Sequence, residues 1–110
     1  MQTINLTELV SGQLDRARSA THGRSAQTIH GDRERRLRQV VMALARGYRL
    51  DAHDSPPEAT LQVLTGEVQL STGFDTWQGS AGDFLVIPDE RHDVLAVQDC
   101  AFILTVVTNR

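Results

Sequence analysis

The sequence predicts an all-β domain, an antiparallel sandwich or barrel, preceded by one short N-terminal helix. From about residue 25 onward, short apolar segments with an alternation of period two follow one another at nearly regular spacing, separated by turn-forming residues. Only the first twenty residues show the spacing of an amphipathic helix. The 110 residues fit one domain, and their 40% hydrophobic content is enough for a core. We therefore expect a helical segment at 1–24 and a single barrel domain at 25–110.

The helix is expected over residues 5–20. Asn5 can cap it, and Glu8 stands three residues later in the capping-box position. Its apolar residues recur at helical spacing: Leu6, Leu9, Val10, Leu14 and Ala17. Gly12 weakens this helix by about 1 kcal/mol relative to Ala. The segment Thr21-His22-Gly23 ends it.

Nine strands are expected in the remainder of the chain. They are residues 26–30, 37–45, 49–52, 60–64, 67–72, 74–78, 83–87, 93–97 and 101–108. In the fourth, Ala59, Leu61 and Val63 share one face, and such small apolar side chains suit a barrel interior. Gly66 then supplies the positive φ that a tight hairpin needs.

The charges are divided unevenly along the chain. Residues 1–50 hold nine Arg and four acids, a net charge of +5, whereas residues 51–110 hold two Arg and ten acids, a net charge of −8. The basic segment 33–38 could be a phosphate-binding patch. The acidic remainder favours the other interpretation, a solvated strand edge or a subunit contact. With five aromatic residues in all, the composition argues against nucleic acid as a partner.

Several other classes of protein are excluded by what the sequence lacks. It has no apolar run near the ~18 residues of a membrane span, and no signal peptide at its start. The single Cys100 cannot form an internal disulfide, so we expect a cytoplasmic protein. It has no basic neighbour that would activate it as a nucleophile. Phosphate-binding loops, nucleophile elbows and zinc-binding motifs are absent as well.

Three segments resemble the cupin superfamily, in particular its small single-domain members (cupin-2 or RmlC-like jelly rolls). Residues 60–68, TLQVLTGEV, resemble the strand-turn-strand of the first cupin motif, and residues 79–92, GSAGDFLVIPDERH, resemble the second. Gly47, followed six residues later by His53, matches the opening of the first motif. The resemblance covers about residues 35–108. It implies a cupin-type antiparallel jelly-roll barrel that forms a homodimer.

The resemblance also implies where a metal would bind. Cupins hold a metal with two His and one Glu from the first motif and one His from the second. His53 stands at the first His position, but the second His position is Ser55 and the Glu position is Ala59. His92 represents the second motif, with a spacing that places Asp93 in the usual register. Two of the four ligands are therefore matched.

Two further residues could complete a metal site. Glu58 would point inward if a bulge at Pro56-Pro57 reversed its facing. His30 could contribute from a neighbouring strand or a partner subunit. A site made of His53, His92, Glu58 and His30 would suit one divalent Fe, Mn, Ni or Zn. Because half of the family's ligands are missing, we expect no bound metal instead.

Three functions remain open. The first is a cupin that binds a small molecule in its barrel, with His53, His92, Trp77 and Phe84 lining the site. The second is a metal-dependent oxygenase or isomerase that uses both histidines. The third is a degenerate barrel that serves homodimerisation alone, since the strand 37–45 and the strand around Phe84 are apolar on both faces. For Trp77, packing within its hairpin is the favoured alternative, and His53 could lie in a surface loop. Catalysis is left undecided.

Overall fold

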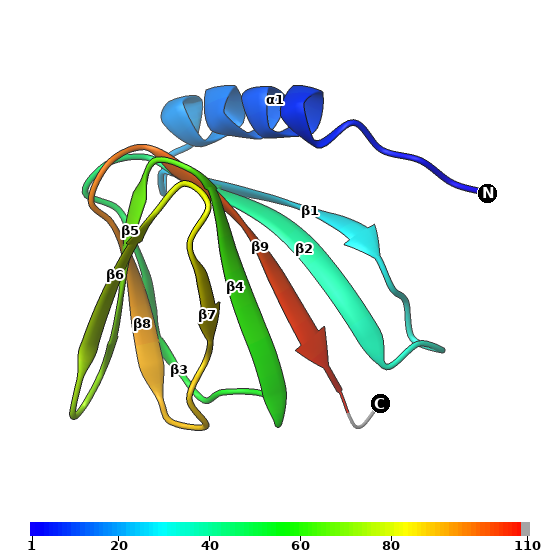
Figure 1. Cartoon of the computed structure of the whole chain (residues 1–110). Coiled ribbons are helices and arrows are strands. Elements are labelled where there is room, and N and C mark those ends of the chain that lie inside the picture. The colour runs from blue at the N-terminus through cyan, green and yellow to red at the C-terminus, as the bar shows by residue number, and fades with distance from the viewer. Residues whose placement is uncertain (109–110) are drawn as a thin grey trace.

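The structure is a computed structural model that describes residues 1–108 (Figure 1). Within these residues it contains one helix, α1 (Leu6–Ser19), which lies on the outside of a β-structure. The strands are β1 (Arg24–His30), β2 (Leu37–Leu44), β3 (Arg49–His53), β4 (Glu58–Thr65), β5 (Glu67–Thr72), β6 (Thr76–Ser80), β7 (Phe84–Val86), β8 (His92–Ala96) and β9 (Cys100–Val107). The last two residues of the expected barrel domain, 109 and 110, lie outside the described residues.

The strands form two antiparallel sheets that face each other. The five-stranded sheet has the order β1-β2-β9-β4-β7, and the four-stranded sheet has the order β3-β8-β5-β6. At several points the chain crosses from one sheet to the other between consecutive strands, for example between β2 and β3, as a jelly roll requires. The all-β fold with one N-terminal helix is therefore confirmed.

One expected strand is displaced along the chain. The strand predicted at 74–78 is β6, which starts two residues later, at Thr76. The reason is a turn held by the Thr72 hydroxyl, whose oxygen accepts hydrogen bonds from the backbone N–H groups of Phe74 and Asp75, both at 3.0 Å. The other boundaries differ from those expected by at most two residues.

The core lies between the two sheets. Its largest fully buried side chains are Leu44, Leu61, Val63, Val68 and Phe102. The β4–β5 hairpin that contributes three of them turns at Gly66, where φ is +79°. A Cβ at this position would lie only 2.0 Å from the carbonyl oxygen of Asp99, so glycine is required there for space as well as for backbone conformation.

Helix α1 packs on the outer face of the five-stranded sheet. Ala17 is fully buried against Ala43 of β2 and Ala101 of β9, and these small side chains let the helix lie close to the sheet. At its start, the side chain of Asn5 accepts a hydrogen bond from the Glu8 backbone N–H at 3.0 Å, as the capping pattern predicts. In the described part of the chain, no helix is long and apolar enough to cross a membrane.

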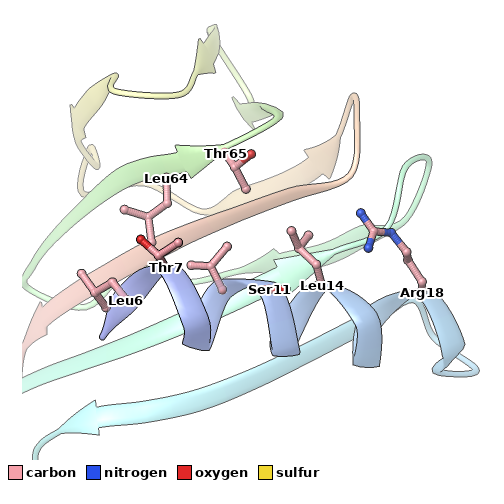
Figure 2. A pocket seen from close by; sticks show the side chains of 8 residues that line it. Leu6, Thr7, Ser11, Leu14, Arg18, Leu64 and Thr65 are labelled. Carbon is pink, nitrogen blue, oxygen red and sulfur yellow. The ribbon is translucent and has the colours of Figure 1, made fainter. Parts of the chain in front are cut away.

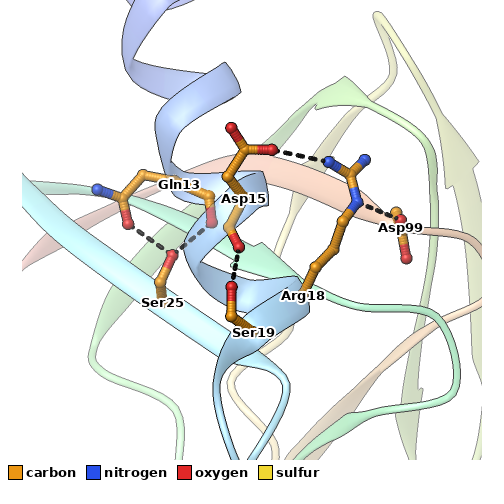
Figure 3. A network of polar contacts seen from close by, with 6 residues as sticks. All are labelled: Gln13, Asp15, Arg18, Ser19, Ser25 and Asp99. Atoms are coloured by element: carbon orange, nitrogen blue, oxygen red, sulfur yellow. Dashed lines mark hydrogen bonds and ion pairs between the residues drawn. The ribbon is translucent and has the colours of Figure 1, made fainter.

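Polar contacts also attach the helix (Figure 3). The buried Gln13 accepts a hydrogen bond from Ser25 Oγ at 2.6 Å and donates one to Gln27 at 3.2 Å. Near the end of the helix, Arg18 Nε donates to Asp99 Oδ2 at 2.8 Å. The helix is thus tied to β1 and to the turn between β8 and β9.

Candidate functional site

Two histidines meet at one end of the four-stranded sheet. His53 ends β3 and His92 begins β8, and the two residues are paired in the register of these strands. Their ring centroids lie 4.6 Å apart in an edge-to-face arrangement. His92 is 4% exposed, whereas His53 is exposed to solvent. The fold therefore brings together the two histidines that the sequence singled out.

Backbone carbonyls hold both imidazole rings. His53 Nδ1 lies 3.0 Å from the carbonyl oxygen of Asp51, and His92 Nδ1 lies 2.9 Å from that of Glu90. Because a carbonyl oxygen only accepts hydrogen bonds, each Nδ1 carries a hydrogen, which in the neutral tautomer leaves Nε2 as the acceptor of each ring. Within residues 1–108, neither Nε2 has a hydrogen-bond partner.

The direction of the side chains along β8 decides which residue of the second motif faces inward. His92, Val94 and Ala96 are buried, whereas the residues between them are partly exposed. Asp93 lies on the outward face, where its Oδ2 accepts a hydrogen bond from Arg49 Nη1 at 2.9 Å. The short Pro-to-His spacing therefore leaves His92, not Asp93, on the interior face.

The residues that could have completed a metal site lie elsewhere. Ala59 is 5% exposed and takes the inward position on β4, whereas its neighbour Glu58 is exposed. Both pair in continuous register with β9, and the β4 irregularity falls between Val63 and Thr65. The bulge that would turn Glu58 inward is therefore absent. Glu58 therefore points to the outer face of its strand, whereas His92 faces the interior.

His30 is also separated from the pair. It ends β1, at the edge of the five-stranded sheet, and its side chain is exposed. Ser55, at the second His position of the motif, hydrogen-bonds through its hydroxyl to the carbonyl oxygen of Pro56 at 2.9 Å. Among residues 1–108, no group of three or more His, Cys, Asp or Glu side chains is placed to hold a metal. The residues present thus provide two imidazoles and do not fit the four-ligand cupin centre.

A pocket of about 460 Å³ lies beside His92. It is lined by Ala52, Ser71, Thr72, Gly73, Phe74, Glu90, Arg91, His92 and Asp93. Arg91 fixes one wall by donating from Nη2 to the carbonyl oxygen of Ala52 at 2.9 Å. Phe74, in the β5–β6 turn, is 90% exposed. Sequence reasoning missed both of these residues, although an aromatic side chain in an otherwise polar turn is a usable signal.

Solved structures with similar folds agree with this geometry. An RmlC-like cupin from Desulfovibrio desulfuricans gives a TM-score of 0.73 at 22% identity, over 97% of this chain and 96% of that one. A cupin-2 domain protein from Shewanella frigidimarina gives 0.72 at 17% identity, over 96% and 94%. The protein KdgF from Halomonas sp. gives 0.68 at 19% identity, over 79% and 80%.

This chain has the cupin fold. The fold expected from its motif-like segments is confirmed by structures that align over nearly its whole length. The sequence itself matches no family model and no curated protein. At these identities the likeness establishes the fold alone, so the function has to be argued from the site.

The two aromatic residues expected at the site lie on opposite sides of the cupin barrel wall. Trp77 is half-buried and packs against the core, and it lies opposite Leu70 in the β5–β6 pairing. It lines a small cavity of about 190 Å³ at the end of the barrel. Phe84, which we expected to line the ligand pocket, instead lies on the outer face with its partner Gln62 and is 59% exposed. The alternation along β7 puts Leu85 on the interior face in its place.

A second, larger groove of about 480 Å³ runs between α1 and β4 on the outside of the barrel (Figure 2). It is lined by Leu6, Thr7, Val10, Ser11, Leu14, Arg18, Leu64 and Thr65. Its charged residue, Arg18, is already engaged by Asp15 at 3.3 Å and Asp99 at 2.8 Å. The groove is therefore an apolar surface rather than a polar site.

Proposed function

We propose that this cupin binds a small organic molecule in the pocket beside His92, without a complete metal centre. The observation that carries the proposal is the His53–His92 pair, with centroids 4.6 Å apart and both Nδ1 atoms occupied by carbonyls. His92 lines the pocket, so its Nε2 is left as an acceptor for a hydroxyl or amide hydrogen of a ligand in the neutral tautomer, and the His53 ring packs against it.

The pocket has the mixed character of small-molecule sites. Its volume of about 460 Å³ falls in the range of roughly 300–1,000 Å³ that is usual for ligand sites. The hydroxyl of Ser71, the guanidinium of Arg91 and the imidazole of His92 can orient a ligand, and the ring of Phe74 can cover its apolar part. No catalytic step is assigned to these groups.

A thermal-shift screen of small polar compounds tests the proposal. Ligands that raise the melting temperature of the wild type should fail to do so for His92→Ala and should act more weakly on His53→Ala. His22→Ala is the matched control, since His22 is exposed in the turn after α1. An equal shift in His92→Ala would place binding elsewhere and contradict the proposal, as would the absence of any ligand across a broad screen.

A metal-dependent enzyme is the second candidate, and one observation favours it. Two neighbouring imidazoles, with ring centroids 4.6 Å apart and Nε2 free in the neutral tautomer, are suitable ligands for a divalent transition metal. Metal-binding histidines also commonly donate their other ring N–H to a carbonyl, as His53 and His92 do here. Such a site would need its remaining ligands from water or from a second molecule, because Glu58 and His30 lie elsewhere.

We also propose that a second copy of this chain covers the part of the outer sheet face that α1 leaves bare. Leu37, Phe84 and Val86 are exposed on that face, by 44%, 59% and 68% respectively. The β1–β2 loop at one edge of the sheet carries three Arg residues, and the segments flanking β7 at the opposite edge carry Asp83, Asp89 and Glu90. A twofold arrangement would place each basic edge against the partner's acidic edge.

A further inference from the structure

The last arginine of the basic segment faces the interior of the barrel. Along β2 the register with β9 is unbroken, with Arg38 opposite Val106, Met42 opposite Phe102 and Leu44 opposite Cys100. Successive residues of a strand alternate between its faces, so Arg38 shares the inward face of Met42 and Leu44. Both of these residues belong to or pack against the core.

Among the residues that the structure describes, the guanidinium of Arg38 has no partner. Its Nε is buried and makes no hydrogen bond, and no ion pair involves this side chain among residues 1–108. By contrast, each of four other arginines is paired with an aspartate: Arg18, Arg35, Arg49 and Arg91. The side chain is half-buried, and a charged donor partly removed from water without an acceptor is costly, so an acceptor at Arg38 would stabilise the fold.

The neighbouring strand makes room for this side chain. Gly31 follows β1 with φ +110°, and a Cβ there would lie 2.9 Å from Arg38 Cγ and 2.8 Å from the Leu37 carbonyl oxygen. Any larger residue at position 31 would displace the stem of Arg38 from its present path. The glycine therefore allows Arg38 to keep its position against the inner face.

The surroundings of Arg38 contain no competing carboxylate on the two strands that flank it in the sheet. The inward residues of β9 are Cys100, Phe102, Leu104 and Val106. Those of β1 opposite Val40 and Met42 are Thr28 and Ala26. The positive charge is therefore uncompensated on its own sheet face.

We propose that Arg38 binds an oxyanion, a carboxylate or a phosphate, on the interior face of the barrel. A guanidinium offers its two Nη groups as a planar fork that matches two oxygens of such a group; within residues 1–108 those of Arg38 have no partner, whereas its Nε is enclosed by protein. The contact is independent of the His53–His92 pair. Arg38 thus has a binding role, although the sequence places it in the basic segment 33–38, which we expected to be solvated.

Thermal stability measured in sodium chloride, sodium acetate and sodium phosphate at equal ionic strength tests this site. For the wild type, acetate or phosphate should raise the melting temperature by several degrees over chloride, and Arg38→Met should lose this anion-specific increment. Whichever anion acts identifies the ligand class. Arg36→Met is the matched control, because Arg36 is exposed in the same basic segment. Excluded salts stabilise any protein, so the difference between the two variants is the readout.

Calorimetric titration with the active anion gives the second measurement. Arg38→Met should bind at least tenfold more weakly than the wild type, and Arg38→Lys should be intermediate, since lysine keeps the charge but loses the fork. Should Arg38→Met fail to fold, Arg38→Lys alone decides the matter. Equal binding by the wild type and the Arg38 variants would overturn the proposal, and so would a wild type that no oxyanion stabilises. His92→Ala should bind the anion as the wild type does, which separates this site from the proposed ligand pocket.

Discussion

Asp99 shows how one side chain can connect distant segments. Its Oδ1 accepts a hydrogen bond from the Arg46 backbone N–H, and its Oδ2 accepts one from Arg18 Nε, both at 2.8 Å. These hydrogen bonds, with that from Arg46 the largest cause, lower the pKa of Asp99 below its usual 3.8. A carboxyl group with a lowered pKa stabilises the fold above its unfolded pKa, and that contribution is lost as the pH falls through the folded value.

We therefore expect Asp99→Asn to be less stable than the wild type at pH 7, by up to about 1 kcal/mol, the size of a partly exposed ion pair. The difference should shrink as the pH falls below 3.8 and the wild-type carboxyl becomes protonated. Thermal unfolding across pH measures it, with Asp15→Asn as the control for losing a single exposed pair. A destabilisation that is constant with pH would show that the charge of Asp99 is unimportant.

Cys100 gives a second prediction for a single residue. Burial raises the pKa of its thiol to about 11, and the side chain is fully buried. A thiol reagent at pH 8 should therefore react only as fast as the protein unfolds, whereas a Ser19→Cys variant, which adds an exposed thiol, should react with that thiol at once. Rapid labelling of the native wild type would contradict the described burial.

Individual residues of the site were only partly predictable from the sequence. The motif spacing identifies His53 and His92. Whether the His92 side chain points inward depends on its being part of β8, and the sequence predicts that this strand starts at residue 93 rather than at His92. Phe84 was assigned to the ligand site, yet a strand that is apolar on both faces does not show which face is inside. Arg38 was missed because its basic neighbours concealed its alternation with Val40 and Met42.

Among the elements, α1 offers the clearest test of packing. Ala17 is fully buried against Ala43 and Ala101, so Ala17→Leu should overfill the contact and destabilise the protein by about 1–3 kcal/mol. Gly12 has nothing within 4 Å of an added Cβ, so Gly12→Ala should stabilise the helix by up to about 1 kcal/mol. Urea unfolding of both variants measures these opposite effects. A neutral Ala17→Leu would indicate that α1 does not hold its described position.

The strands were predictable because turn residues separate them and because alternation marks their length. The exception is β6, because hydrophobic patterning places the start of this strand at the apolar residue Phe74. Its true start is set by the Thr72 hydroxyl, which holds the turn through two backbone N–H groups. Such a side-chain contact within a turn leaves little trace in hydrophobic patterning.

The whole molecule leads to a prediction about assembly. If a second copy covers the outer sheet face, light scattering should give a mass of twice the 12.2 kDa chain. The double variant Phe84→Ser, Val86→Thr should be monomeric, because it removes apolar side chains that the interface would bury. Phe74→Ser is the control, since Phe74 is equally apolar but lies in the β5–β6 turn beside the His92 pocket. A wild type that is monomeric at micromolar concentration would contradict this arrangement.

At the same scale, the sequence predicted the two-sheet jelly roll because the motif-like segments imply the order of strands as well as their existence. The sequence could not predict the pocket beside His92, because three segments that are distant in sequence form it: Ala52, residues 71–74 and residues 90–93. Volume and lining of this kind follow from tertiary packing rather than from any single segment.

The most direct test of a cupin site that works without a complete metal centre is elemental analysis of the untagged protein, purified from metal-supplemented cells. We expect far less than one metal atom per chain, with no difference among the wild type, His53→Ala and His92→Ala. Close to one Fe, Mn, Ni or Zn per chain, lost in both variants, would contradict it and make the metal-dependent enzyme the better explanation.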